Sequence, residues 1–158
     1  MLTLTRDDFR IDASRFDLTR GSNVLRIIAG AFLFPHIAGK FVNGAFNPGT
    51  LAFFAKAGLT PPEFWLGLAA VSELLVAVFL ILGLCTRFAA LGGAAVLLMA
   101  VYALQVVKGF GWTWNTGGYE YPVFWAITCS VVAMDAWKAY FAQARSTAAG
   151  RVGGLLTA

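Results

Sequence analysis

Four apolar segments, each about 20 residues long, limit the folds that this chain can form. They cover residues 24–43, 64–84, 88–107 and 121–141. A helix of this length rises about 30 Å, which is the thickness of the hydrocarbon core of a bilayer. Hydrophobic residues make up 59% of the 158 residues and charged residues only 13%, against about 25% charged in a typical soluble domain. The sequence therefore predicts an all-α integral membrane protein, a four-helix bundle with antiparallel up-down topology.

The connections predict the orientation of this bundle. Thr86 and Arg87 lie in the gap of three residues between the second and third segments, which indicates a tight antiparallel hairpin. The longer connections, 44–63 and 108–120, then share the opposite side. Cytoplasmic loops carry the excess of Lys and Arg, so both termini are expected in the cytoplasm. Nine basic residues lie on the side of the termini, Arg6, Arg10, Arg15, Arg20, Arg26, Arg87, Lys138, Arg145 and Arg151, and three on the other, Lys40, Lys56 and Lys108.

The segments outside the bundle have distinct compositions. Residues 1–23 alternate Arg and Asp with scattered apolar side chains, which fits either a short helix on the membrane surface or a solvated tail. Residues 24–141 form the predicted membrane domain, and residues 142–158, rich in Ala, Gly and Thr, are expected to be a flexible tail. Within 44–63, the stretch LAFFAKAGL predicts a short interfacial helix.

The first apolar segment carries Arg26, His36 and Lys40, which fall within an arc of about 120° on a helix. Charged side chains at membrane depth usually face the interior of a bundle or a wet cavity. Pro35 lacks an N–H donor and predicts a kink beside His36. The first helix therefore has one polar face that the other helices must cover.

Glu73 lies in the second segment at nearly the same depth as His36, about 12–13 Å from one membrane boundary. We expect a hydrogen bond between His36 and Glu73, with Lys40 one turn away adding its charge. The cluster is either a polar clasp that fixes helix register or a ligand site. Aromatic side chains in the 108–120 connection are usually interfacial anchors, and Glu120 there suits a helix N-terminus. Alternatively, these residues complete the same pocket: Trp112, Trp114, Glu120 and Tyr121.

At the other end of the bundle, Asp135 of the fourth segment is expected to reach Arg26 and Arg87 and to form structural ion pairs.

Several other chemistries find no support in the sequence. Cys85 and Cys129 lie at different depths and form no C-x-x-C motif, which argues against thiol–disulfide exchange. One histidine offers no metal-ligand cluster. Nucleotide-binding and haem motifs are absent, and no basic stripe suits nucleic acid.

The ordered set of these residues resembles the DoxX family of small four-helix bacterial membrane proteins over residues 24–137. The similarity rests on LRIIAGAFLFPHIAGKF, on the stretch from FFAKAGLTPPEFW to LCTRFAAL, on GGYEYPVFWAIT and on MDAW. The chain departs from the family where Val131-Val132-Ala133-Met134 replaces a Gly-Pro-Gly-like turn. The matching positions are Arg26, Gly30, His36, Gly39, Lys40, Glu73, Gly83, Thr86, Arg87, Glu120, Tyr121, Pro122 and Asp135.

The resemblance implies a membrane subunit of a redox system, since some relatives belong to thiosulfate:quinone oxidoreductase or to redox-defence complexes. A quinone near His36, Lys40 and Glu73 is the ligand considered first. No cofactor motif lies in this chain, so electrons are expected from a redox partner protein, and a homo-oligomer is the other assembly considered. A non-enzymatic membrane scaffold for a partner protein is the second hypothesis. A small-solute transporter ranks last, because no broken-helix pair or internal repeat is evident.

Overall fold

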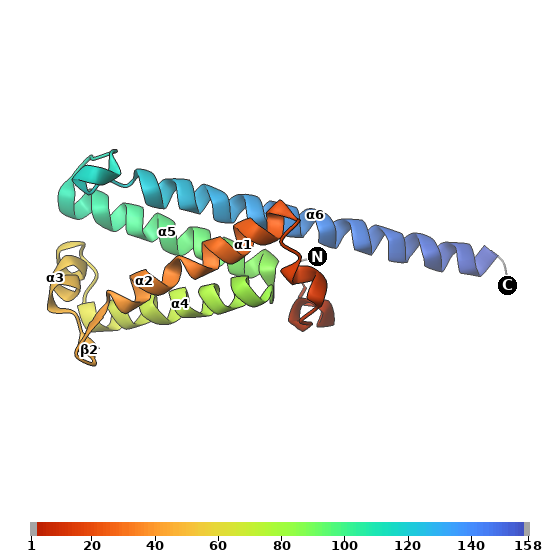
Figure 1. Cartoon of the computed structure of the whole chain (residues 1–158), viewed down its shortest axis with the longest axis horizontal. Helices are drawn as coiled ribbons and strands as arrows, with labels where there is room; N and C mark the ends of the chain where they lie inside the picture. Colours follow the sequence, from red (N-terminus) through yellow and green to blue (C-terminus); the bar gives the residue numbers. More distant parts are fainter. Residues whose placement is uncertain (1–2, 157–158) are drawn as a thin grey trace.

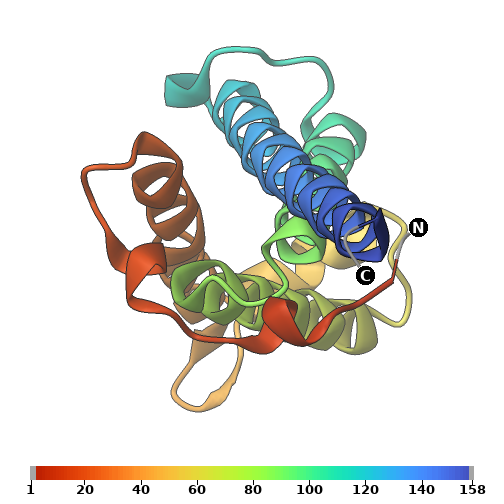
Figure 2. The same ribbon diagram turned by 90° about the vertical axis from the view of Figure 1, so that its right-hand side faces the viewer.

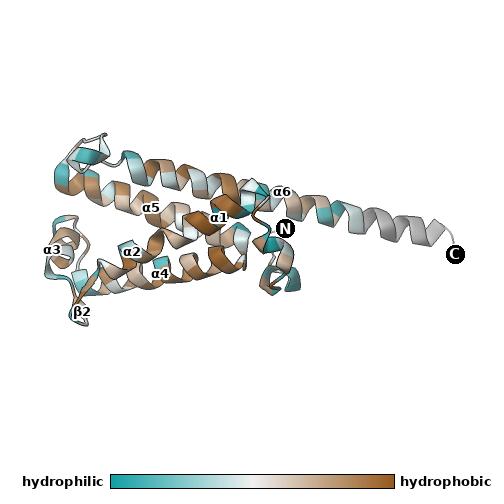
Figure 3. Ribbon diagram, viewed as in Figure 1, coloured by the Kyte–Doolittle hydropathy of each residue, from teal (hydrophilic) through white to brown (hydrophobic). Residues whose placement is uncertain are grey.

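The computed structural model describes residues 3–156 of the chain and the side chains of residues 3–147. Within this part, three helical segments are long and apolar enough to cross a membrane. The first combines α1 (Gly21–Ala31) and α2 (Leu33–Ala38), and the others are α4 (Pro62–Leu82) and α5 (Thr86–Lys108). Figure 1 shows them lying along one long axis, and Figure 3 shows their apolar character. The protein is a mostly helical membrane protein with several apolar helices.

A further long helix, α6 (Glu120–Leu156), runs along α5. Further contacts join α1 to α4 and α6, α4 to α5, and both α2 and α3 to α4. At the centre, Leu80, Leu97 and Trp125 are buried together with small side chains such as Ala90. Small residues let helices approach closely, which is the main source of helix association in lipid. The outward faces carry exposed large apolar side chains, among them Val71, Leu74, Leu75, Leu91 and Leu98.

The predicted tight hairpin between α4 and α5 is confirmed. Gly83 has a φ of 72° in the left-handed region, and this conformation ends α4. Cys85 also has a positive φ, 43°, immediately before α5 begins. Thr86 Oγ1 donates a hydrogen bond of 3.0 Å to the Gly83 carbonyl and closes the turn.

The first apolar segment forms a shorter helix than predicted. The helix breaks at Phe32, three residues before Pro35, and ends at Ala38 instead of continuing to Asn43. A small hairpin follows, with β1 (Phe41–Val42) paired antiparallel to β2 (Ala45–Phe46). Asn43 and Gly44 take φ values of 50° and 78°, and an Asn-Gly pair is the preferred sequence for such two-residue turns.

The 44–63 connection contains the predicted short helix, α3 (Pro48–Lys56). Asn47 caps it, since its side-chain oxygen accepts a hydrogen bond from the Gly49 N–H at 2.9 Å. The 108–120 connection contains one short 3-10 turn, η3 (Trp114–Thr116). Both connections lie at the same end of the molecule (Figure 1).

From residue 3 to residue 20, the N-terminal segment forms two short 3-10 turns, η1 (Arg6–Phe9) and η2 (Ala13–Phe16), and no continuous helix. It crosses the end of the molecule where α4 passes into α5 (Figure 2). The Cys85 N–H donates a hydrogen bond of 2.7 Å to the Asp8 carbonyl. The segment is therefore attached to the helices through a backbone contact that the sequence analysis did not anticipate.

The fourth apolar segment continues as helix well beyond Phe141. α6 extends without a break to Leu156 and projects past the other helices (Figure 1). Its continuation is consistent with the Ala, Gln and Arg residues at 142–145, which favour helix. A separate tail beginning at 142 is therefore not observed, while the flexibility expected there remains a prediction.

Candidate functional site

Lys40 and Glu73 form a buried ion pair between the end of α2 and the middle of α4. Lys40 Nζ lies 2.8 Å from Glu73 Oε1 and 2.6 Å from Oε2, and it also donates to the His36 carbonyl at 3.2 Å. Lys40 is 9% exposed and Glu73 8%. Buried charges are costly unless paired and hydrogen-bonded, so each of these side chains depends on the other.

An apolar cavity of about 490 Å³ lies directly beside this pair. Its walls come from α2, α4, α5 and the beginning of α6, and the two adjacent phenylalanines of α3 also line it. Besides the ion pair, polar groups are contributed by His36, Ser72 and Tyr121. Most of the lining is apolar, with large side chains from Phe53, Phe54, Trp65, Leu68, Leu97, Met99, Leu104 and Trp125. Cavities of this size and composition are typical of small-molecule sites.

The predicted hydrogen bond between His36 and Glu73 is wrong, because Lys40 takes the carboxylate. α2 ends at Ala38, and the Lys40 side chain reaches from beyond the helix end onto Glu73. The His36 ring instead lies 5.4 Å from the Trp125 ring of α6, centroid to centroid. His36 and Glu73 still line the same cavity, so the structure brings the two residues together around a shared space.

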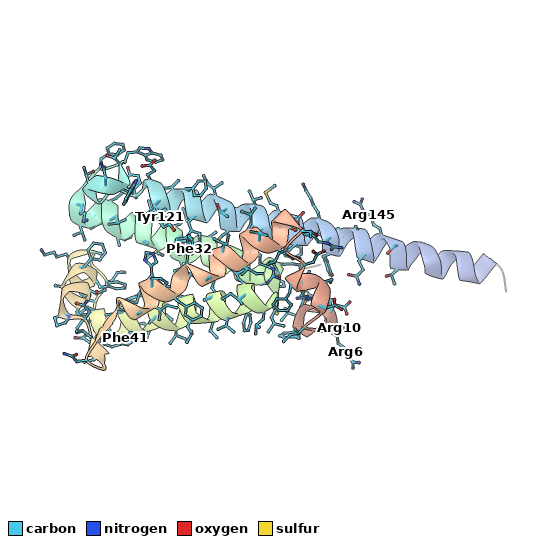
Figure 4. All side chains as sticks on the ribbon, viewed as in Figure 1. Arg6, Arg10, Phe32, Phe41, Tyr121 and Arg145 are labelled. Carbon is cyan, nitrogen blue, oxygen red and sulfur yellow. The ribbon has the colours of Figure 1, made fainter. Side chains whose placement is uncertain are left out.

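The aromatic groups of α6 are fixed on the cavity wall. Trp125 Nε1 donates a hydrogen bond of 3.2 Å to the Ala29 carbonyl in α1, and the Tyr121 ring lies 5.6 Å from the Trp125 ring. The buried indole of Trp125 therefore connects α6 to α1. Tyr121 lies four residues before Trp125, in the first turn of α6 and nearer the end that carries η3 (Figure 4).

The other predicted ligand residues do not reach this cavity. Trp112, Trp114 and Glu120 line a separate groove, together with Tyr121 and the first turns of α6. Glu120 lies in the first turn of α6, and its Oε2 accepts a 3.4 Å hydrogen bond from the Trp114 N–H. This arrangement fits a helix N-terminus stabilised by a carboxylate. Tyr121 is the residue of this group that the structure places at both sites.

The predicted ion pairs of Asp135 are not formed. Arg87 instead pairs with Asp8, whose Oδ2 lies 2.6 Å from Arg87 Nη2. Arg26 donates to the backbone carbonyls of Leu80, Ile81 and Arg15. The prediction failed because the N-terminal segment covers this end of the molecule and brings in a nearer carboxylate. Asp135 is exposed, although it lines a pocket with both arginines.

Asp8 is thus a structural residue that sequence reasoning missed. Thr5-x-x-Asp8 matches the capping-box pattern, and the Thr5 N–H and Oγ1 both donate to Asp8 Oδ2, at 2.7 and 2.8 Å. The capping-box pattern is visible in the sequence, but nothing in the sequence shows that Asp8 pairs with Arg87.

In the described part of the chain, no group of three or more His, Cys, Asp or Glu side chains is placed to bind a metal ion. Cys85 and Cys129 are both buried as free thiols.

A family profile for DoxX matches residues 21–106, more than half of the sequence. The chain belongs to the DoxX family. The region matched to DoxX includes both members of the buried ion pair and both buried arginines, while the 108–120 connection and α6 lie outside it. Comparison with curated proteins and with solved structures finds no match for this chain.

Proposed function

We propose that this DoxX protein is a membrane subunit of a redox system and binds a lipophilic ligand of the quinone class in the cavity beside Lys40 and Glu73. The observation that carries the proposal is an apolar cavity of about 490 Å³ with a buried ion pair on its wall. A quinone needs an apolar slot for its tail and hydrogen-bond donors for its carbonyl oxygens. The residues around this cavity supply both.

Each polar group has a distinct role in this proposal. The Lys40 ammonium and the Tyr121 hydroxyl are donors for carbonyl oxygens, while Glu73 holds Lys40 in place. His36 also lines the cavity, and its ring nitrogens can donate or accept a hydrogen bond with a ligand. A bound quinone would supply the electron chemistry. Electrons are expected to come from a partner protein.

The proposed placement in the membrane follows from the charges. We infer that α6 is the fourth crossing and that both termini are cytoplasmic. Arg6, Arg10 and Arg145 lie at the end of the molecule away from Phe41 (Figure 4), and the positive-inside rule assigns that end to the cytoplasm. The cavity then opens toward the periplasmic side of the bacterial inner membrane, where α3 lies over it.

The test is a titration of the purified protein with a short-tailed ubiquinone analogue. Binding is measured as the quenching of tryptophan fluorescence. Trp65 and Trp125 line the cavity and report on its occupancy. We expect Glu73→Gln and His36→Ala each to weaken binding about tenfold, the equivalent of about 1.4 kcal/mol. Asp135→Asn makes a comparable change at the opposite end and should keep the wild-type affinity. Unchanged affinity in both cavity variants would remove the quinone from this site.

The alternative is a non-enzymatic scaffold that stabilises a partner protein. In that case Glu73→Gln lowers the abundance of the protein and its co-purification with the partner, and the quinone analogue has no saturable effect on wild-type fluorescence. The same set of variants therefore separates the two functions.

A further inference from the structure

A second, polar pocket of about 210 Å³ lies at the opposite end of the molecule from the quinone cavity. The N-terminal segment, the first turns of α1 and α5, and one turn of α6 enclose it. Three arginines, Arg15, Arg26 and Arg87, contribute to its lining. Because α4 ends and α5 begins here, the pocket lies at the boundary of the predicted hydrocarbon core, the depth of lipid headgroups.

Arg26 is a buried charge without a carboxylate partner among the described side chains. It is 4% exposed, and its hydrogen bonds go to the carbonyls of Leu80, Ile81 and Arg15. Carbonyl oxygens satisfy N–H donors but carry no net negative charge to offset the guanidinium. A buried charge without a counter-ion is costly. A counter-anion in the pocket would remove that cost.

Arg87 is also incompletely satisfied. It is 3% exposed, and Asp8 accepts hydrogen bonds from its Nε and Nη2 at 3.1 and 2.6 Å. Its Nη1 is buried and has no hydrogen-bond partner within residues 3–147. The Tyr140 ring lies 3.8 Å from Arg87 Cζ, which stabilises the charge but provides no acceptor oxygen.

Two helix N-termini add to the positive potential of this pocket. Ser22 and Asn23 of α1 and Thr86 of α5 line it. Neither helix has an acidic residue in its first turn or a side-chain hydrogen bond at its N-cap. The first-turn N–H groups and the positive end of the helix dipole favour an anion at such a position.

We propose that this pocket binds a phosphate group, from either the headgroup of an anionic phospholipid or free inorganic phosphate. Basic pockets between membrane helices suit such headgroups, and guanidinium groups bind phosphate oxygens in a forked geometry. Two carboxylates oppose the anion. The charge of Asp8 is already paired with Arg87. Asp135 is exposed at the rim of the pocket and forms no ion pair with Arg26 or Arg87 in the described structure.

Ser22 and Asp135 are exposed and allow a test that spares the buried arginines. Ser22→Asp places a carboxylate in the first turn of α1, where it should preserve folding and compete with the anion. Thr50→Asp is the matched control, because it adds the same charge to the first turn of α3 at the other end. Asp135→Asn removes a competing charge from the rim and should tighten binding.

The experiment measures Tm of the purified protein in neutral detergent, with added phosphatidylglycerol, phosphatidylcholine or inorganic phosphate. A ligand that binds only the folded state raises Tm in a saturable way. We expect phosphatidylglycerol or inorganic phosphate to do so and phosphatidylcholine not to. Ser22→Asp should weaken the apparent affinity about tenfold, which corresponds to one added charge repulsion of about 1.4 kcal/mol. Thr50→Asp should behave as the wild type.

The two sources of phosphate separate in the same measurement. A shift with phosphatidylglycerol alone identifies the lipid headgroup, and a shift with inorganic phosphate in neutral detergent identifies the free anion. Equal shifts in wild type and Ser22→Asp, or no shift with either anion, would overturn the proposal. Quinone binding does not enter this experiment, so the two proposals fail independently.

Discussion

Arg87, in the first turn of α5, is held by Asp8, which lies 79 residues earlier in the chain. The carboxylate accepts hydrogen bonds from Arg87 and from Thr5 and lies within the hydrogen-bonded η1 turn. The Asp8 backbone carbonyl adds a contact to Cys85. This single residue therefore fastens the N-terminal segment across the end of the α4–α5 hairpin.

Replacing Asp8 with Asn should destabilise the folded protein by about 3 kcal/mol, because it leaves the buried Arg87 without its counter-charge. The N-terminal segment should also become sensitive to protease in the folded state. Chemical unfolding in detergent measures the first effect and limited proteolysis the second.

Asp7→Asn is the control for this change. Asp7 is exposed, so the same loss of charge one residue earlier should alter the free energy of unfolding by less than about 0.5 kcal/mol. Equal destabilisation by the two variants would show that the Asp8–Arg87 pair has no special role.

The same pair predicts a dependence of stability on pH. Burial alone would raise the pKa of Asp8, but the hydrogen bonds from Arg87 and Thr5 outweigh it and lower the pKa below its ordinary value of 3.8. The folded state therefore binds this proton less readily than the unfolded state, and the stabilisation is complete above pH 3.8 and is lost as the pH falls toward the lowered pKa. Wild type and Asp8→Asn should differ in Tm at neutral pH and converge under strongly acidic conditions. A difference that persists unchanged in acid would contradict this assignment.

The sequence predicted the helices well because lipid-crossing segments carry a strong compositional signal. The bounds of α4 and α5 lie within two residues of the predicted segments. The end of the first helix was predicted five residues too late, at Asn43 instead of Ala38, because the Asn43-Gly44 turn signal follows directly on an apolar run. A hydropathy average over about 20 residues does not register such a turn, because the turn depends on the identity of only two residues.

The site was predicted only in part, because partner choice depends on geometry beyond helical periodicity. The prediction that His36, Lys40 and Glu73 lie together is met by the cavity that all three line, but the prediction paired the Glu73 carboxylate with the His36 imidazole. Where α2 ends decides which side chain reaches Glu73, and that end was misplaced. Asp8 was missed for a related reason, since nothing local in a polar N-terminal segment reveals which distant arginine it meets.

The Lys40–Glu73 pair allows its structural and functional roles to be separated. Lys40→Met or Glu73→Met alone leaves an unpaired buried charge and should cost about 3 kcal/mol of folding free energy. The double variant replaces both charges with apolar side chains and should recover most of that loss. Denaturant unfolding of the four proteins gives the coupling energy. A double variant as unstable as the sum of the two single variants would contradict the pairing.

If the pair serves the proposed quinone site, the stable double variant should still fail to bind the quinone analogue. Recovery of stability together with normal binding would assign the pair to structure alone. Fluorescence titration of the double variant beside the wild type makes this comparison.

Gly30 predicts how closely α1 and α4 must pack. A Cβ atom at this position would lie 2.8 Å from the Ala77 carbonyl oxygen and 3.0 Å from Leu80 Cβ, so the helices must separate to admit it. Gly30→Ala should therefore destabilise the protein by about 2 kcal/mol, although alanine is intrinsically the better helix former. Gly92→Ala is the matched control in α5, where the nearest atom, Val76 Cγ2, lies at an ordinary 3.5 Å. Unfolding in mixed detergent should show a loss of stability for Gly30→Ala and none for Gly92→Ala. Equal stability of the two variants would mean that α1 and α4 do not pack this closely.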